Sequence, residues 1–141
     1  MTMPSAVTIL TWARLVRASA KALNTAELAL KQAGLPPLEW YELLAELQHK
    51  TPIRPRDLQG PLHAEQYSLS RLIARTVRAG LVLRRPCPGD ARGHTLELTE
   101  AGTAMRAAMW PVYGAAIEQA LGTRLTEDER LTLAGLLQRL V

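Results

Sequence analysis

The sequence is poor in cysteine and in aromatic residues. It has one cysteine, Cys87, no phenylalanine, and only 4% aromatic residues over 141 positions. A single cysteine excludes an intramolecular disulfide framework and any metal site built from several cysteines. The three histidines, His49, His63 and His94, lack the i, i+4 spacing of a helical zinc site. We therefore predict neither a catalytic nor a structural metal.

Long hydrophobic runs are also absent. No uninterrupted apolar run reaches the roughly 18 residues that a membrane-spanning helix needs. The first ten residues carry no basic region, and Arg14 and Arg17 interrupt the apolar stretch that follows, so no signal peptide is predicted. The composition, 48% hydrophobic and 21% charged, is that of a globular protein. We therefore expect one soluble, cytoplasmic domain with its own core.

Common catalytic motifs are missing as well. The sequence shows no Ser-His-Asp context, glycine-rich phosphate loop or carboxylate pair, so we expect neither an enzyme nor a bound cofactor. Cys87 lies between two prolines and follows Arg84 and Arg85, which could favour its thiolate. Two interpretations of this cysteine stay open, an incidental exposed thiol and a redox switch.

Positive charge is concentrated in the middle third of the chain. The net charge is +4, and residues 50–99 contain nine basic and four acidic residues, whereas the rest contains eight basic and nine acidic residues. Eight of those nine basic residues are arginine, which suits bidentate contacts to phosphates and base edges. This asymmetry predicts an anionic partner for the middle segment.

Hydrophobic periodicity predicts a mainly α-helical fold with one small β-hairpin. The predicted helices cover residues 6–33, 38–48, 54–60, 65–79 and 100–122, with a last helix after Thr126, where Glu129 has the capping-box spacing. The hairpin joins strands at 81–85 and 95–99 through a loop that holds two prolines and two glycines. Gly34 and Gly80 are expected to end the helices before them.

The helix over residues 65–79 has an apolar face and a basic face. Its inward positions are Leu69, Leu72, Ile73 and Val77, and its outward positions are Arg71, Arg75 and Arg78. A short helix, a tight turn, a helix with a row of arginines and a basic hairpin follow one another here. That order is typical of a winged helix-turn-helix, in which the second helix enters the major groove.

The stretch over residues 68–102 resembles the signature region of the multiple antibiotic resistance regulator (MarR) family of bacterial transcription factors. The matching elements are Leu-Ser-Arg-Leu at 69–72, Ala-Gly-Leu-Val at 79–82, Arg84 with Arg85, Asp-x-Arg-Gly at 90–93 and Leu-Thr-x-x-Gly at 98–102. The order of helices outside this region is also similar to the family. The chain departs from the common pattern at Thr76, where leucine is frequent, and at Ala74, where aspartate is frequent.

The resemblance implies a homodimer that binds double-stranded DNA. Residues 6–33 and 100–141 would form the dimerisation helices, and residues 36–99 the winged helix-turn-helix lobe. Two-fold symmetry implies a pseudo-palindromic operator with half-sites about one helical turn, roughly 34 Å, apart. Relatives often bind small aromatic effectors between these regions, so Trp12, Trp40 and Tyr41 are candidate ligand residues. Their simpler interpretation is core or dimer interface.

Candidate DNA-binding residues lie on the predicted recognition helix and hairpin. Together with the resemblance, the arginine row favours contacts of Arg71 and Arg75 in the major groove, and the resemblance implies that Arg92 enters the minor groove. Asp90 is expected to brace the hairpin through a hydrogen bond to an arginine. The other candidates are Gln66, Ser68, Ser70 and Arg84. For the helix arginines the competing interpretation is a solvated surface.

We therefore predict a sequence-specific transcriptional regulator, a repressor rather than an activator, with no membrane association. The alternative is a winged-helix protein-interaction module whose basic surface docks an acidic partner. Cys87 lies in the hairpin, whereas redox-sensing family members carry their cysteine near the N-terminal helix, so redox control does not follow from the resemblance.

Overall fold

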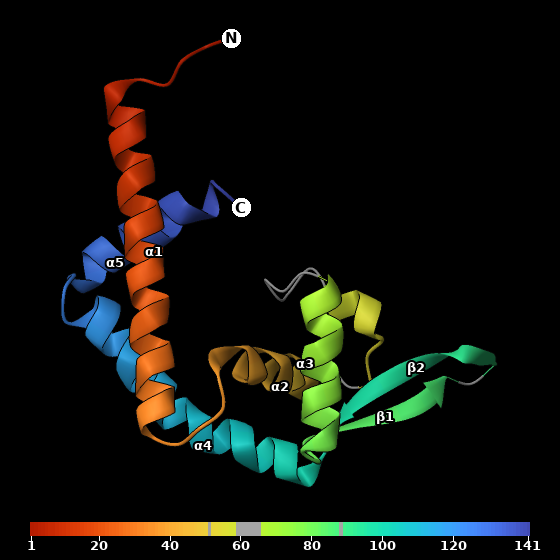
Figure 1. The fold of residues 1–141 in the computed structure, drawn as a ribbon. Helices are drawn as coiled ribbons and strands as arrows, with labels where there is room; N and C mark the ends of the chain where they lie inside the picture. Colours follow the sequence, from red (N-terminus) through yellow and green to blue (C-terminus); the bar gives the residue numbers. More distant parts are fainter. Residues whose placement is uncertain (51, 59–65, 88) are drawn as a thin grey trace. The chain divides into compact units, whose positions relative to one another are not determined.

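The computed structural model describes residues 1–50, 52–58, 66–87 and 89–141 and has the predicted mainly α-helical architecture (Figure 1). Its elements are α1 (Ala6–Gln32), α2 (Leu38–His49), the 3-10 helix η1 (Pro55–Leu58), α3 (Gln66–Arg78), β1 (Val82–Cys87), β2 (Asp90–Leu98), α4 (Glu100–Ile117), the π-helical turn η2 (Glu118–Gly122) and α5 (Glu127–Gln138). The two strands form one antiparallel hairpin. The predicted fold class is therefore confirmed.

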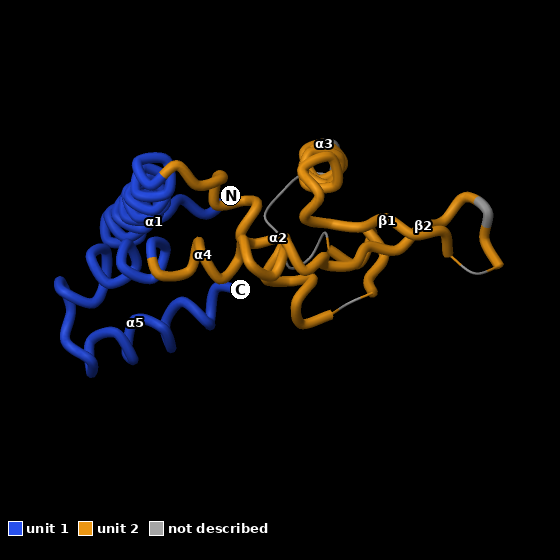
Figure 2. The backbone as a smooth tube through the Cα atoms, turned by 90° about the horizontal axis from the view of Figure 1, so that it is seen from below, with its two compact units in different colours: residues 1–33, 112–141 blue, residues 34–111 orange. Residues whose placement is uncertain are grey.

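The chain divides into two compact units (Figure 2). Unit 1 comprises residues 1–33 and 112–141, and unit 2 comprises residues 34–111. The predicted lobe, residues 36–99, falls inside unit 2, which also takes α4 as far as Pro111. The predicted dimerisation segments fall in unit 1 apart from that part of α4, and their role stays a prediction.

An aliphatic core holds unit 2 together. The buried residues of this core are Leu43, Leu44, Leu47, Ile53, Leu58, Leu69, Leu72, Ile73, Leu81, Val82 and Leu96. They come from α2, η1, α3, the hairpin and the segments beside them, so each of these elements covers the apolar face of another. The core fixes α3 against the base of the hairpin, which projects away from it (Figure 1).

Gly80 terminates α3 as predicted, two residues after the last helical residue, Arg78. This glycine has φ of 79°, a left-handed conformation that costs an L side chain about 1 kcal/mol or more. The N–H of Leu81 donates to the carbonyl of Thr76 at 3.0 Å, and the N–H of Gly80 donates to that of Val77 at 3.0 Å. These two bonds form a Schellman motif, which closes the helix and directs the chain into β1.

The hairpin differs from the prediction in the length of its strands. β1 continues through Pro86, which pairs with His94, and β2 begins at Asp90, so the predicted loop is mostly strand. Proline stops a central strand because it lacks an N–H, but among the described residues β1 has only one neighbouring strand, so its proline costs no ladder bond on the open edge. The register shifts between Pro86 and Cys87, where the pairing becomes irregular.

Two predicted helices also differ in detail. The short helix expected over 54–60 is a 3-10 helix of four residues, Pro55–Leu58, anchored by the buried Leu58. Arg54 precedes this helix, while residues 59–60 of that prediction, the tight turn at Gly60 and Pro61, and Glu65 lie outside the described residues. The helix expected over 100–122 is α-helical only to Ile117 and continues as the π-helical turn η2, which ends at Gly122.

The capping box predicted for the last helix is present. The hydroxyl of Thr126 accepts a hydrogen bond from the N–H of Glu129 at 3.2 Å, and the carboxylate of Glu129 accepts one from the N–H of Thr126 at 2.9 Å. The backbone bond, and then the side-chain bond, to Thr126 lower the pKa of Glu129 below its ordinary value. The start of α5 is thus fixed by local chemistry that can be read from sequence.

Candidate nucleic-acid interface

α3 separates apolar from basic side chains as its periodicity predicts. Leu69, Leu72 and Ile73 are buried, with exposed fractions of 2–3%. The exposed positions are Ser70, Arg71, Arg75 and Arg78, while Ser68 is half-buried. Gln66 is the first residue of α3, and its side chain lies outside the described part of the structure. The helix therefore presents hydroxyl and guanidinium groups on one side and its anchoring residues on the other.

Thr76 is a polar residue on the buried side of α3. Its side chain is fully buried, and its hydroxyl donates to the carbonyl oxygens of Leu72 at 3.0 Å and Ile73 at 2.9 Å. These bonds satisfy the hydroxyl within the helix, so the buried oxygen carries no unpaired penalty. A threonine can therefore occupy this buried position, and α3 runs on through it.

The hairpin formed by β1 and β2, called the wing below, carries arginines that lie in different environments. Arg84 pairs in register with the buried Leu96, and its own side chain is exposed. The Nε of Arg85 donates to Oε2 of Glu97 at 2.7 Å, an ion pair between the strands. Arg92, also exposed, lies on β2 two residues beyond Asp90. The wing thus adds exposed guanidinium groups to the unit that carries α3.

Asp90 braces the distal end of the wing in a way that differs from the prediction. Its Oδ1 accepts a hydrogen bond from the main-chain N–H of Arg92 at 3.0 Å. Within the described residues it has no guanidinium partner, although a charge-assisted bond to an arginine was predicted. The physical reason is local, because an aspartate two residues before an N–H can close an Asx-type turn on its own backbone. The guanidinium of Arg92 is consequently not used for bracing.

The segment before η1 joins the wing to the rest of unit 2, a feature that the sequence did not predict. Ile53 and Leu96 exchange both main-chain hydrogen bonds, at 3.1 and 2.8 Å. Next to them, Nη2 of Arg54 donates to Sγ of Cys87 at 2.9 Å. These partners are more than 30 residues apart in the chain, so no local pattern could reveal them. Cys87 is partly buried and serves as a hydrogen-bond acceptor.

The three aromatic residues predicted as ligand candidates lie in different environments. Trp40 packs against the core of unit 2, whereas Trp12 belongs to unit 1 and is 67% exposed. Tyr41 is buried and stacks on Trp110, with ring centroids 6.1 Å apart. Arg106, which the sequence analysis did not single out, lies over the Tyr41 ring at 5.6 Å. Its Nε is buried and has no hydrogen-bond partner in the described structure.

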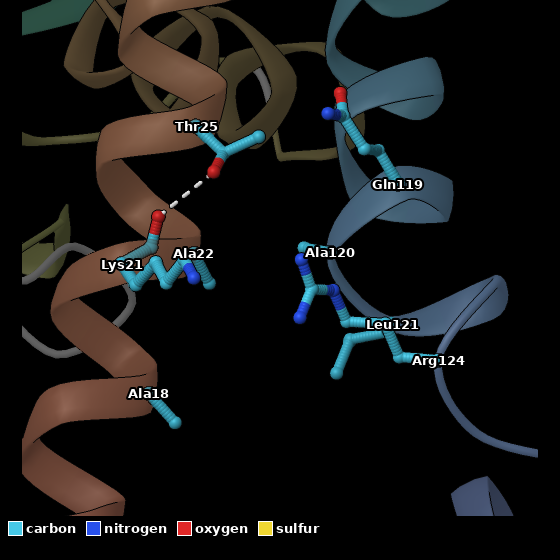
Figure 3. Close-up of a pocket in the computed structure, with 8 residues that line it drawn as sticks. All are labelled: Ala18, Lys21, Ala22, Thr25, Gln119, Ala120, Leu121 and Arg124. Carbon is cyan, nitrogen blue, oxygen red and sulfur yellow. Dashed lines mark hydrogen bonds between the residues drawn. The ribbon is translucent and has the colours of Figure 1, made fainter.

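Unit 1 contains a cavity of about 180 Å³ between α1 and the η2 region (Figure 3). Its walls are mainly small and apolar, and its charged groups are the cations Lys21 and Arg124, with the Arg124 guanidinium pointing into the space. The lining residues are Ala18, Lys21, Ala22, Thr25, Gln119, Ala120, Leu121 and Arg124. None of the aromatic candidates lines it. The cavity marks a place where the helices of unit 1 do not fill the space between them.

Metal-binding and membrane-spanning features are lacking in the described part of the chain. Among the described residues, no group of three or more histidine, cysteine, aspartate or glutamate side chains could hold a metal ion. No described helix is both long and apolar enough to cross a bilayer. The candidate site is therefore the set of exposed arginines on α3 and on the wing, two elements that pack on the same core.

Comparison with known proteins identifies the family. The MarR family model matches residues 33–93. The multiple antibiotic resistance protein MarR of Escherichia coli K12 is 32% identical over 101 residues, which cover 72% of this chain and 70% of that protein. Among solved structures, Sco3205, a MarR family transcriptional regulator from Streptomyces coelicolor in complex with DNA, matches with a TM-score of 0.89 and 25% identity over 99% of this chain and 89% of that chain. A mutant of E. coli MarR complexed with operator DNA matches with a TM-score of 0.83 and 26% identity over 99% of both chains. The chain belongs to the MarR family of winged-helix transcriptional regulators, which is not a class of enzymes.

Proposed function

We propose that this protein is a repressor that binds a pseudo-palindromic operator as a homodimer and is released by a small aromatic ligand. The observation that carries the proposal is one compact unit that presents an arginine row on α3 beside a wing with further exposed arginines. Guanidinium groups on such a helix suit base edges and phosphates of the major groove, and a wing arginine suits the minor groove. Occupation of a promoter by such a dimer would block transcription.

The DNA contacts follow from the position of each group. Arg71 and Arg75 lie one helical turn apart on the exposed side of α3 and would read or clamp the major groove. Ser68, Ser70 and Gln66, nearer the start of α3, would hydrogen-bond to phosphates or base edges. The wing would place Arg84 on the phosphate backbone and Arg92 in the minor groove.

The homodimer accounts for the apolar surface of unit 1. Large hydrophobic side chains are exposed along α1 and α5, an arrangement that a lone unit in water would not favour. They include Val7, Ile9, Leu10, Trp12, Val16 and Leu23 on α1 and Leu131, Leu136 and Leu137 on α5. A second copy would cover this surface and fill the open space between α1 and η2. Two-fold symmetry would then place two copies of α3 on successive half-sites.

The effector would bind near the Tyr41, Trp110 and Arg106 cluster. Trp110 is 48% exposed and could stack a planar ring, and the unpartnered Nε of Arg106 could donate to a carboxylate. Trp12 and Trp40 remain further candidates. Titration with benzoate should quench tryptophan fluorescence and lower DNA affinity. In an Arg106→Gln variant both responses should be lost, and an unchanged response there would remove Arg106 from the site.

Selection of genomic DNA fragments by the purified protein at about 150 mM salt tests the main proposal, because nonspecific binding is already weakened there. Enrichment of one palindrome, with two protomers per duplex by light scattering, is the expected result. A protein-interaction module would instead retain only weak DNA affinity without sequence preference. Failure to enrich any sequence in the absence of benzoate would contradict the proposed function.

Replacing Arg92 with alanine is expected to weaken operator binding and to flatten its salt dependence. One lost phosphate contact lowers the magnitude of the slope of log K against log salt by roughly 0.9. The main-chain bond from Arg92 to Asp90 survives the substitution, so the turn should stay intact. Affinities measured by fluorescence anisotropy between about 50 and 200 mM salt give the slope. An unchanged slope would show that Arg92 touches no phosphate.

A further inference from the structure

The wing carries two consecutive arginines that face opposite ways. Successive side chains of a strand alternate between the two faces of a sheet. Arg84 pairs in register with Leu96, whose side chain is fully buried, whereas Arg85 pairs with Thr95 on the other face. The two guanidinium groups therefore leave the same strand in opposite directions, although the sequence makes them look equivalent.

Only one of these arginines has an acidic partner in the described structure. The Nε of Arg85 lies 2.7 Å from Oε2 of Glu97, and the side chains are 58% and 31% exposed. The other acidic residue of the two strands, Asp90, is engaged with the main chain of Arg92. Among the described residues Arg84 makes no ion pair. The positive charge of Arg84 is thus available to a ligand, while that of Arg85 is already compensated.

We infer that Glu97 is a specificity-determining residue, because it withholds Arg85 from DNA phosphates. This inference rests on the proposed DNA-binding function. Phosphate contacts carry no sequence information and supply nearly all nonspecific affinity. A wing with two phosphate-binding arginines would strengthen binding to every sequence alike. By pairing with Arg85, Glu97 limits this contribution, and discrimination rests more heavily on the contacts of α3.

The geometry of the ion pair places the Glu97 carboxylate where it competes with a DNA phosphate for Arg85. The bond is short and charge-assisted, and Glu97 is the less exposed of the two partners. A phosphate approaching Arg85 would have to displace this carboxylate and would meet its negative charge. Glu97 therefore opposes the contact both by occupying the donor and by repelling the ligand.

A double-mutant cycle tests the inference. The variants are Glu97→Gln, Arg85→Gln and the double substitution, with Glu100→Gln as a control that removes an exposed carboxylate outside the ion pair. Affinities for operator and for random-sequence duplex are measured from about 50 to 200 mM salt. Glu97→Gln should raise the affinity for random duplex about three- to tenfold, steepen its salt slope by roughly 0.9 and lower the ratio of operator to random affinity. In the Arg85→Gln background the same substitution should have no more effect than the control.

Two results would overturn the inference. One is a Glu97→Gln variant whose affinity and slope equal those of Glu100→Gln, since the effect would then be general electrostatics. The other is a Glu97→Gln effect that persists without Arg85. The coupling between Glu97 and Arg85 is measured on random-sequence duplex, so the measurement does not require that the protein have a specific operator. A wild-type protein that shows no sequence preference would contradict the proposed function, and the cycle would still report whether Glu97 restrains Arg85.

Discussion

Replacing Arg75 with alanine is expected to lower operator affinity about 10- to 100-fold and to relax specificity at the base pairs it contacts. The estimate corresponds to one bidentate base contact, about 1–3 kcal/mol. Arg75 is exposed on α3, and the neighbouring Leu72 and Ile73 fix the helix in the core, so the substitution should leave folding intact. Anisotropy titrations against the selected operator and single-base variants of it measure both effects.

Arg78→Ala is the matched control, since it removes a guanidinium from the final residue of the same helix, three positions beyond Arg75. The start of a recognition helix lies nearest the base edges, and Arg78 can also interact with the helix dipole, so its loss should cost less than about threefold. Equal losses for the two variants would show that the row acts only as diffuse charge. An Arg75→Ala protein that binds its operator like the wild type would place the base contacts elsewhere.

The exposed basic face of α3 could be predicted from the sequence because it depends only on residues that are close together in the chain. Helical periodicity assigns Leu72 to the core and Arg75 to the outside, and the structure places both accordingly. The capping box at Thr126 likewise needs only a three-residue spacing. In each case the residues that determine the outcome lie within one or two turns of each other, so the sequence contains all the information that the prediction needs.

The contacts that could not be predicted from the sequence join residues that are far apart in the chain. The bond from Arg54 to Cys87 and the β-bridge between Ile53 and Leu96 join segments that only tertiary structure brings together. Sequence reasoning places Pro86 in a loop because proline opposes strands, and only the topology shows that β1 has an open edge. The Arg85 ion pair depends on the register of the hairpin, which a longer predicted loop leaves undefined.

The close approach of α4 to the start of the wing is a further long-range feature, and it predicts a large effect at Gly102. This glycine is buried within α4, and a Cβ there would overlap the carbonyl oxygen of Leu81 and lie 2.6 Å from Cδ1 of Leu98. The same Leu81 carbonyl accepts the N–H of Thr99 at 3.1 Å, and the Thr99 hydroxyl accepts that of Gly102 at 2.9 Å. The backbone atoms that a methyl group would meet are therefore held in place by the helix start itself.

Gly102→Ala should consequently destabilise unit 2 by about 3 kcal/mol, at the upper end of overpacking effects. Helix propensity alone predicts the opposite sign, a gain of up to about 1 kcal/mol, so the sign of the measured change separates the two effects. Gly135→Ala is the control, because a Cβ on Gly135 in α5 would have no described atom within 4 Å, and this variant should match or exceed wild-type stability. Urea unfolding followed by circular dichroism gives both values from the shift in midpoint at constant m. A Gly102→Ala protein as stable as the wild type would mean that α4 can move away from Leu81 at little cost, and the wing would then lack the rigid base on which the proposed contacts of Arg84 and Arg92 depend.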